Sequence, residues 1–260
     1  MEQVVHHGRE TAYRLVRPEA DGPAALYVHG SGADHRLWTH QYAPTGPFHP
    51  AAALDLSGHG DSGDIDTDAG PETLAAYAED VAAVARSVEA DLLVGNSLGG
   101  AVLLETLLSN RVEVSGAVFA GTGAKLAVHD SIRAMLREDF EAAVETLHTD
   151  SRLLYDPDET VRERSQSALR SVGRRVTRRD FETCHRFDAR ERLGELDVPA
   201  LAVVGEQDSL TPPSYHEFLA DKLPDCTLAV VEDAAHLAML EQPAAFNAAV
   251  ETVADRLPGR

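Results

Sequence analysis

A serine set between glycines is the residue whose type and spacing most clearly indicate chemistry. Residues 95–99 read Gly-Asn-Ser-Leu-Gly, with Ser97 at the centre, and they follow the mainly apolar stretch 90–94. The pattern G-x-S-x-G between a strand and a helix is typical of a nucleophile elbow, in which a tight turn exposes the serine hydroxyl. The helix that follows directs N–H groups and its positive dipole end toward the reacting centre. We therefore expect Ser97 to be a nucleophile rather than a serine that merely fills a turn.

The elements around this turn alternate between strands and helices. Residues 2–17 predict two short strands joined by a turn at residues 7–10. Strands that are apolar on both faces belong in a sheet covered on both sides, which indicates an α/β fold. The nearly continuous apolar runs that predict such strands are residues 24–29, 51–56, 91–95, 114–120, 200–205 and 227–232.

Four helices are predicted between and after these strands. Apolar residues recur at spacings of three and four over 74–88, and a second helix over 99–110 starts directly after Ser97. A third begins near Thr211, which we expect to be its N-cap, and the last begins at Pro243. The expected fold therefore places a helix directly after the serine turn.

Residues 121–195 interrupt the alternation. This stretch is rich in arginine and acidic residues and contains no convincing strand. We interpret it as a helical cap insertion in a core formed by residues 1–120 and 196–260. The insertion's expected helices are 131–147, 158–172 and 178–193.

On these segments the chain closely resembles the α/β-hydrolase family over nearly its whole length. The resemblance implies a mostly parallel central sheet with helices on both faces and a catalytic triad. In that family the acid follows a late strand, which implies Asp208, and the base follows the last strand, which implies His236. The order Ser97, Asp208, His236 is the order associated with this fold.

The same resemblance implies an oxyanion hole. One donor is the backbone N–H of Leu98, the residue after the nucleophile, and the other is the N–H of Ser31. Gly30 and Gly32 flank Ser31 and let the backbone of this substrate loop approach the substrate closely.

Competing residues fit less well. His59 precedes the serine, and its loop is mainly structural in the family, while Asp233 lies on the wrong loop for the acid. The other histidines show no metal-ligand spacing, so we expect neither a metal nor a cofactor. Cys184 and Cys226 lie far apart without such spacing and are expected to be reduced thiols.

The expected reaction is hydrolysis of a small-molecule carboxylic ester through an acyl-enzyme. Carbon–carbon bond hydrolases of ring-fission products are the alternative, but Leu98 and Leu237 depart from their usual pattern, as does Ala33-Asp34-His35. A ligand-binding receptor on the same fold is a second alternative, although a receptor has no need of a full triad. Four arginines of the insertion are interpreted as solvated residues of cap helices: Arg133, Arg137, Arg174 and Arg175.

The charge balance concerns solvent and partners. The 260 residues carry a formal net charge of −20, and only Lys125 and Lys222 are lysines. Such a charge disfavours nucleic acid and anionic membrane surfaces as partners. The acid-rich, lysine-poor composition resembles proteins of salt-accumulating halophiles. The first ten residues lack the layout of a secretory signal, so we expect a cytoplasmic protein, monomeric or a small homo-oligomer.

Overall fold

The computed structural model describes residues 1–44, 46–149, 151–253 and 256–257. Eight strands form one sheet in the order β1-β2-β4-β3-β5-β6-β7-β8, in which β2 pairs antiparallel with both β1 and β4 and all the other pairings are parallel. The strands are Glu2–His6 (β1), Arg9–Val16 (β2), Ala25–Val28 (β3), Ala51–Leu54 (β4), Leu92–Asn96 (β5), Gly116–Ala120 (β6), Ala200–Gly205 (β7) and Cys226–Val231 (β8).

Ten α-helices and two short 3-10 helices lie among the described residues. The α-helices are Thr39–Tyr42 (α1), Pro71–Ser87 (α2), Leu98–Leu108 (α3), Asp130–Glu138 (α4), Phe140–Leu147 (α5), Glu159–Val172 (α6), Arg174–Arg186 (α7), Pro213–Lys222 (α8), Ala238–Glu241 (α9) and Pro243–Glu251 (α10). The 3-10 helices are His35–Trp38 and Leu193–Glu195. None of the helices in this described part is both long and apolar enough to cross a membrane.

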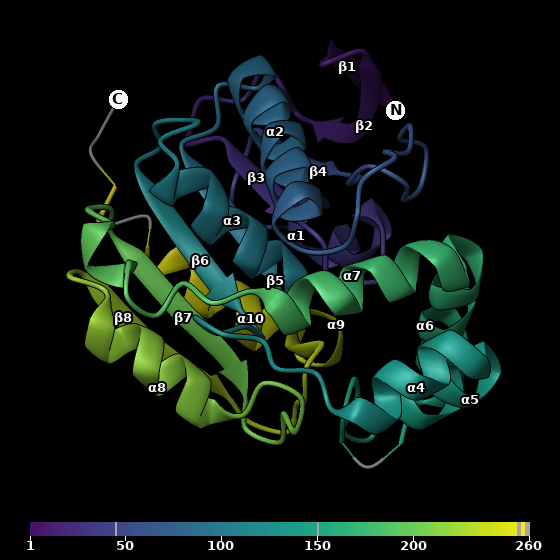
Figure 1. Cartoon of the computed structure of the whole chain (residues 1–260). Helices are drawn as coiled ribbons and strands as arrows, with labels where there is room; N and C mark the ends of the chain where they lie inside the picture. The colour runs from purple at the N-terminus through teal and green to yellow at the C-terminus, as the bar shows by residue number, and fades with distance from the viewer. Residues whose placement is uncertain (45, 150, 254–255, 258–260) are drawn as a thin grey trace.

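Two apolar layers enclose the sheet. Helices α2, α3 and α8 cover one face and α1, α9 and α10 the other, which Figure 1 shows as helices in front of and behind the strands. The four residues of β3 are all buried, as expected for a central strand between two layers. The predicted α/β fold with helices on both faces is confirmed.

The edge strand β8 differs from the prediction. Its sequence is as apolar as that of the central strands, yet Leu228 is 38% and Val230 48% exposed. Strand β8 pairs only with β7, at the end of the sheet, so the covering helices do not enclose it fully.

Helices α4 to α7 lie between β6 and β7 in the chain and beyond the strand ends in space (Figure 1). The expected helix 131–147 is two helices, because the Asp139 carboxylate accepts the Ala142 N–H and starts α5 there. The expected helix 178–193 is also wrong at both ends: α7 begins after Gly173, whose φ of 83° breaks the helix, and it ends at Arg186.

Candidate active site

Ser97 occupies a strained turn between β5 and α3. Its φ of 55° and ψ of −117° are unusual for a non-glycine residue. Two hydrogen bonds hold this backbone: the Ser97 N–H donates to the Ala120 carbonyl at 2.9 Å, and the Thr122 hydroxyl donates to the Ser97 carbonyl at 2.8 Å. Strain of this kind persists only where the surroundings fix it, and it concentrates at functional sites. The turn has the geometry that the G-x-S-x-G pattern predicts.

The carboxyl ends of β7 and β8 bring Asp208 and His236 together. His236 Nδ1 lies 2.9 Å from Asp208 Oδ2, and both residues are buried. The backbone N–H groups of Leu210 and Thr211 donate to Asp208 Oδ1 at 2.8 and 2.9 Å. Burial would raise the pKa of the Asp208 carboxyl, but the neighbouring His236 and the Thr211 hydrogen bonds outweigh it and keep that pKa below its usual value. An ionised Asp208 therefore accepts the Nδ1–H of His236.

Thr211, expected to be the N-cap of a helix, contacts the His236–Asp208 pair instead. Helix α8 has Pro212 at its N-cap, so the prediction of Thr211 as N-cap is wrong. Instead the Thr211 hydroxyl donates to Asp208 Oδ2 at 2.7 Å and lies 3.2 Å from His236 Nδ1. Sequence reasoning missed this contact, although a threonine three residues after an aspartate at a strand end is the signal for it, since such aspartates often bond the backbone just ahead.

The serine turn and the His236–Asp208 pair border the same cavity. Its volume is about 950 Å³, and its walls include Ser97 and His236. The Asn96 side chain links the two segments, because its Nδ2 donates to the His236 carbonyl at 3.3 Å. Among the described residues no hydrogen bond joins the Ser97 hydroxyl to His236, and His236 Nε2 has no hydrogen-bond partner. Such contacts often tighten only when substrate binds.

The predicted oxyanion donors lie close to this turn. Leu98 is the first residue of α3, and Ser31 borders the cavity. Within the described part of the chain, neither backbone N–H has a hydrogen-bond acceptor. A Cβ added to Gly30 would lie 3.0 Å from the Ser97 Cβ, so only glycine lets the loop pass this close. Gly32 has a φ of +68°, which also favours glycine.

The segment between β6 and β7 supplies much of the cavity wall. Residues from α4, α6 and α7, including Ile132, Leu169 and Phe181, face the core residues across the cavity. Arg133, Arg137, Arg174 and Arg175 do not line it; Arg133 instead pairs with Glu182 at 2.8 Å. The arginines that do line it were not singled out from the sequence: Arg36, Arg152 and Arg164.

The residues that competed with the proposed triad in the sequence lie elsewhere or have other partners. Asp233 is exposed and makes no hydrogen bond to His236 among the described residues. His59 is buried and pairs with Asp180 of α7 at 2.9 Å. Cys184 and Cys226 are free thiols, as expected, and burial raises the pKa of Cys184 to about 12 and that of Cys226 to about 11.

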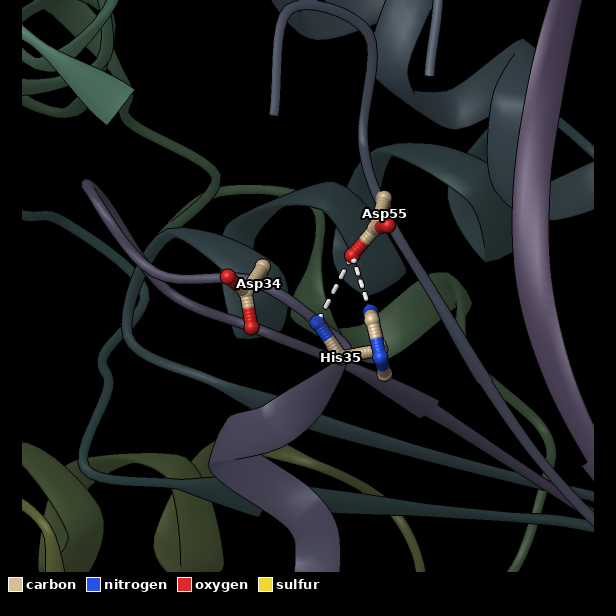
Figure 2. Close-up of side chains that lie close together, drawn as sticks. All are labelled: Asp34, His35 and Asp55. Atoms are coloured by element: carbon tan, nitrogen blue, oxygen red, sulfur yellow. Dashed lines mark hydrogen bonds and ion pairs between the residues drawn. The ribbon is translucent and has the colours of Figure 1, made fainter. Parts of the chain in front are cut away.

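One cluster has the residue types of a metal site, although the spacing in the sequence gave no sign of it. Asp34, His35 and Asp55 place a possible ligand atom each within 4.8 Å of one another (Figure 2). Asp55 Oδ1 accepts the backbone N–H and Nδ1–H of His35, and Oδ2 accepts the Asp61 N–H. Both oxygens of Asp34 accept hydrogen bonds from Arg36. The carboxylates are thus already satisfied by donors and do not fit a cation.

A family model described as alpha/beta hydrolase family matches residues 25–249 of the chain. The chain belongs to this family. It is 31% identical to a pimeloyl-[acyl-carrier protein] methyl ester esterase of Neisseria meningitidis serogroup A, with 90% of this chain and 78% of the relative covered. It is 25% identical to 3-oxoadipate enol-lactonase 1 of Acinetobacter baylyi, with 92% and 91% covered.

A solved structure agrees with these relatives. The hydrolase described here superposes on a thermophilic esterase with a TM-score of 0.85 and 30% sequence identity, covering 98% of this chain and 97% of that one. The protein is therefore an esterase-like enzyme of the alpha/beta hydrolase family.

Proposed function

We propose that the protein hydrolyses small-molecule carboxylic esters with Ser97 as nucleophile, His236 as general base and Asp208 as its orienting acid. The observation that carries this proposal is the convergence of a strained serine turn and a buried histidine–carboxylate pair on one cavity of about 950 Å³. The esterase names of its relatives are consistent with it.

The first half of the reaction forms an acyl-enzyme. Ser97 Oγ attacks the ester carbonyl carbon while its proton passes to His236 Nε2. Asp208 remains ionised and stabilises the imidazolium through Nδ1–H. The carbon–oxygen bond to the leaving alcohol then breaks, and the alkoxide takes the proton from Nε2. In the second half, water gives a proton to the same nitrogen and attacks the acyl carbon. The bond between that carbon and Ser97 Oγ then breaks, Oγ takes the proton back from Nε2, and the acid is released.

The oxyanion formed in each half is bound by two backbone donors. The N–H groups of Ser31 and Leu98 are the proposed donors, since both lie beside the serine and have no acceptor among the described residues. Each such donor contributes about 100- to 1000-fold to kcat in serine hydrolases. In this proposal, residues 121–195 act as a cap that shapes the acyl and alcohol pockets.

Replacement of the nucleophile tests the proposal. Ser97→Ala is expected to lower p-nitrophenyl ester hydrolysis by at least about a thousandfold, because it removes the attacking oxygen. Labelling by a fluorophosphonate probe should disappear with it. Ser109→Ala, at the other end of α3, is the matched control and should keep wild-type activity. A folded Ser97→Ala protein with the wild-type rate would refute the proposed chemistry.

A substrate comparison separates ester from carbon–carbon hydrolysis. Ester cleavage needs only addition at a carbonyl and an alkoxide leaving group, whereas carbon–carbon cleavage requires ketonisation of a dienol first. Leu98 and Leu237 occupy the positions where this chain departs from the carbon–carbon hydrolases. We expect turnover of short and medium acyl p-nitrophenyl esters and negligible cleavage of a 2-hydroxy-6-oxo-dienoate. A higher kcat/KM for the dienoate than for every ester would contradict the assignment.

A further inference from the structure

A carboxylate of the insertion reaches the loop that carries the proposed oxyanion donor. Asp180 of α7 accepts the backbone N–H of Gly32 at 3.2 Å through Oδ2, and both residues are buried. The bonded N–H belongs to the peptide unit that joins Ser31 to Gly32. A hydrogen bond to this peptide restricts its rotation and so affects the orientation of the neighbouring Ser31 N–H.

Asp180 is itself held in one orientation. Its Oδ1 accepts the Tyr77 hydroxyl at 2.7 Å, and its Oδ2 also accepts His59 Nε2–H at 2.9 Å. The Tyr77 hydroxyl in turn accepts a hydrogen bond from Arg179 Nη2 at 3.0 Å. Asp180 is 0% exposed, so a change of its rotamer would leave several buried polar groups unpaired. The carboxylate is therefore a fixed acceptor.

His59 links Asp180 to the other side of the loop. Its Nδ1 faces the Ser57 carbonyl at 3.3 Å, so both ring nitrogens face acceptors, which suits the doubly protonated ring. The ring lies 4.7 Å from that of His29. Burial and the charge of His59 lower the pKa of His29 to about 4. His29 is thus neutral: its Nε2 accepts the Leu56 N–H, and its Nδ1–H donates to the Gly30 carbonyl at 2.8 Å.

The insertion also packs directly on the loop. A Cβ added to Gly32 would lie 3.1 Å from Leu169 of α6 and 3.3 Å from the Thr177 hydroxyl of α7. The loop therefore lies in van der Waals contact with two cap helices, and its position depends on theirs.

We propose that Asp180 is a positioning residue for ester hydrolysis: by holding the Ser31–Gly32 peptide it orients the Ser31 N–H toward the oxyanion, with His59 fixing Asp180. This inference rests on the proposed function. It makes the oxyanion hole a joint product of core and insertion, complete only when α7 is docked on the loop.

The effect should fall on kcat rather than KM. An oxyanion donor acts mainly when negative charge develops on the substrate, so its misorientation weakens transition-state binding more than substrate binding. Asp180→Ala is expected to lower kcat by about 10- to 100-fold, with KM within about threefold. The inhibition constant of an aryl trifluoromethyl ketone, which forms an oxyanion on the serine, should rise by about the same factor as kcat/KM falls.

Two further variants separate positioning from packing. Tyr77→Phe removes one of the hydrogen bonds that hold Asp180 but leaves the acceptor of the Gly32 N–H in place, so its kcat should fall by less than that of Asp180→Ala. Asp180→Asn keeps the side-chain volume and one acceptor oxygen, so its kcat should lie between those of Asp180→Ala and wild type. Circular dichroism and melting temperature establish that each variant folds.

The outcomes are distinct. Wild-type kcat in folded Asp180→Ala, or an equal loss in Tyr77→Phe, would overturn the positioning role while leaving the triad untouched. If Asp180→Ala does not fold, wild-type kcat and ketone affinity in Asp180→Asn would overturn it. A wild-type protein that neither hydrolyses esters nor reacts with the fluorophosphonate would instead refute the proposed function on which this role rests.

Discussion

Two buried histidine–aspartate pairs of this protein have the same length. His236 and Asp208 are 2.9 Å apart, and so are His59 and Asp180. His236 borders the cavity, and among the described residues its Nε2 has no hydrogen-bond partner, whereas both ring nitrogens of His59 face acceptors and the residue is 1% exposed. In the proposed mechanism the first pair supplies the base, whereas the contacts of the second pair suit a fixed ion pair. The two histidines differ in whether they border the cavity and in whether both of their ring nitrogens face acceptors.

The largest expected effect contrasts the two histidines directly. His236→Ala should lower kcat for a p-nitrophenyl ester by at least about a thousandfold, because Ser97 loses its base. His59→Gln should lower kcat by about tenfold, because the loss of the His59 hydrogen bond leaves Asp180 less firmly oriented. Steady-state kinetics on both variants, with folding checked by circular dichroism, measures the contrast. Equal losses would mean that the two pairs are not functionally different.

A smaller effect is expected from the hydroxyl that supports the first pair. Thr211→Val preserves the shape of the side chain but removes the hydrogen bond to Asp208 Oδ2, so kcat should fall by about tenfold. Thr106→Val is the matched control, since its buried hydroxyl donates to the Val102 carbonyl within α3 and to no other acceptor in the described part of the chain. Unchanged kcat in Thr211→Val would show that the two backbone N–H groups alone orient Asp208.

The pair formed by His59 and Asp180 should also affect how the stability of the protein depends on pH. Burial would lower the pKa of His59, but the charge and hydrogen bond of Asp180 outweigh it and raise that pKa above its ordinary value. The folded protein therefore binds the proton more tightly than the unfolded chain, and this stabilisation is full below about pH 6.5 and lost as pH rises through the folded pKa. Urea unfolding should show the stability advantage of wild type over His59→Gln shrinking as the pH rises above about 6.5. An advantage that grows with pH would contradict a protonated His59.

The smallest effect expected is that of the His59–Asp180 pair on the salt dependence of the melting temperature. We propose that the net charge of −20 makes the protein salt-stabilised. Screening lengths fall from about 10 Å at 0.1 M to about 3 Å at 1 M salt, which weakens repulsion between surface carboxylates but acts little on buried pairs. The melting temperature should rise by the same amount in wild type and His59→Gln. A flat or falling melting temperature would refute the salt-stabilised interpretation.

Local pattern and chain order predicted much of the architecture. The glycines around Ser97 and the apolar runs between helices are local signals, so the sheet and the serine turn follow from them. Asp208 and His236 were placed by family resemblance, and the structure brings them together.

The contacts that the sequence did not predict join distant segments. Asp180 and Gly32 lie 148 residues apart, and nothing in either segment indicates the other. His35 and Asp55 meet for the same reason, because two loops follow neighbouring strands. The exposure of Val230 depends on its strand's position at the sheet edge, which hydrophobicity alone does not encode.

The left-handed backbone at Ser97 has a consequence for how such a chain changes over generations. A residue with φ of 55° costs about 1 to 3 kcal/mol unless it is glycine, and under the proposed function this cost to the folded state is offset by the catalytic use of Ser97. If a lineage no longer needed the reaction, glycine at this position would be favoured by stability alone. In a descendant that keeps the fold but no longer catalyses the reaction, we therefore expect replacement of Ser97 to be one of the first changes.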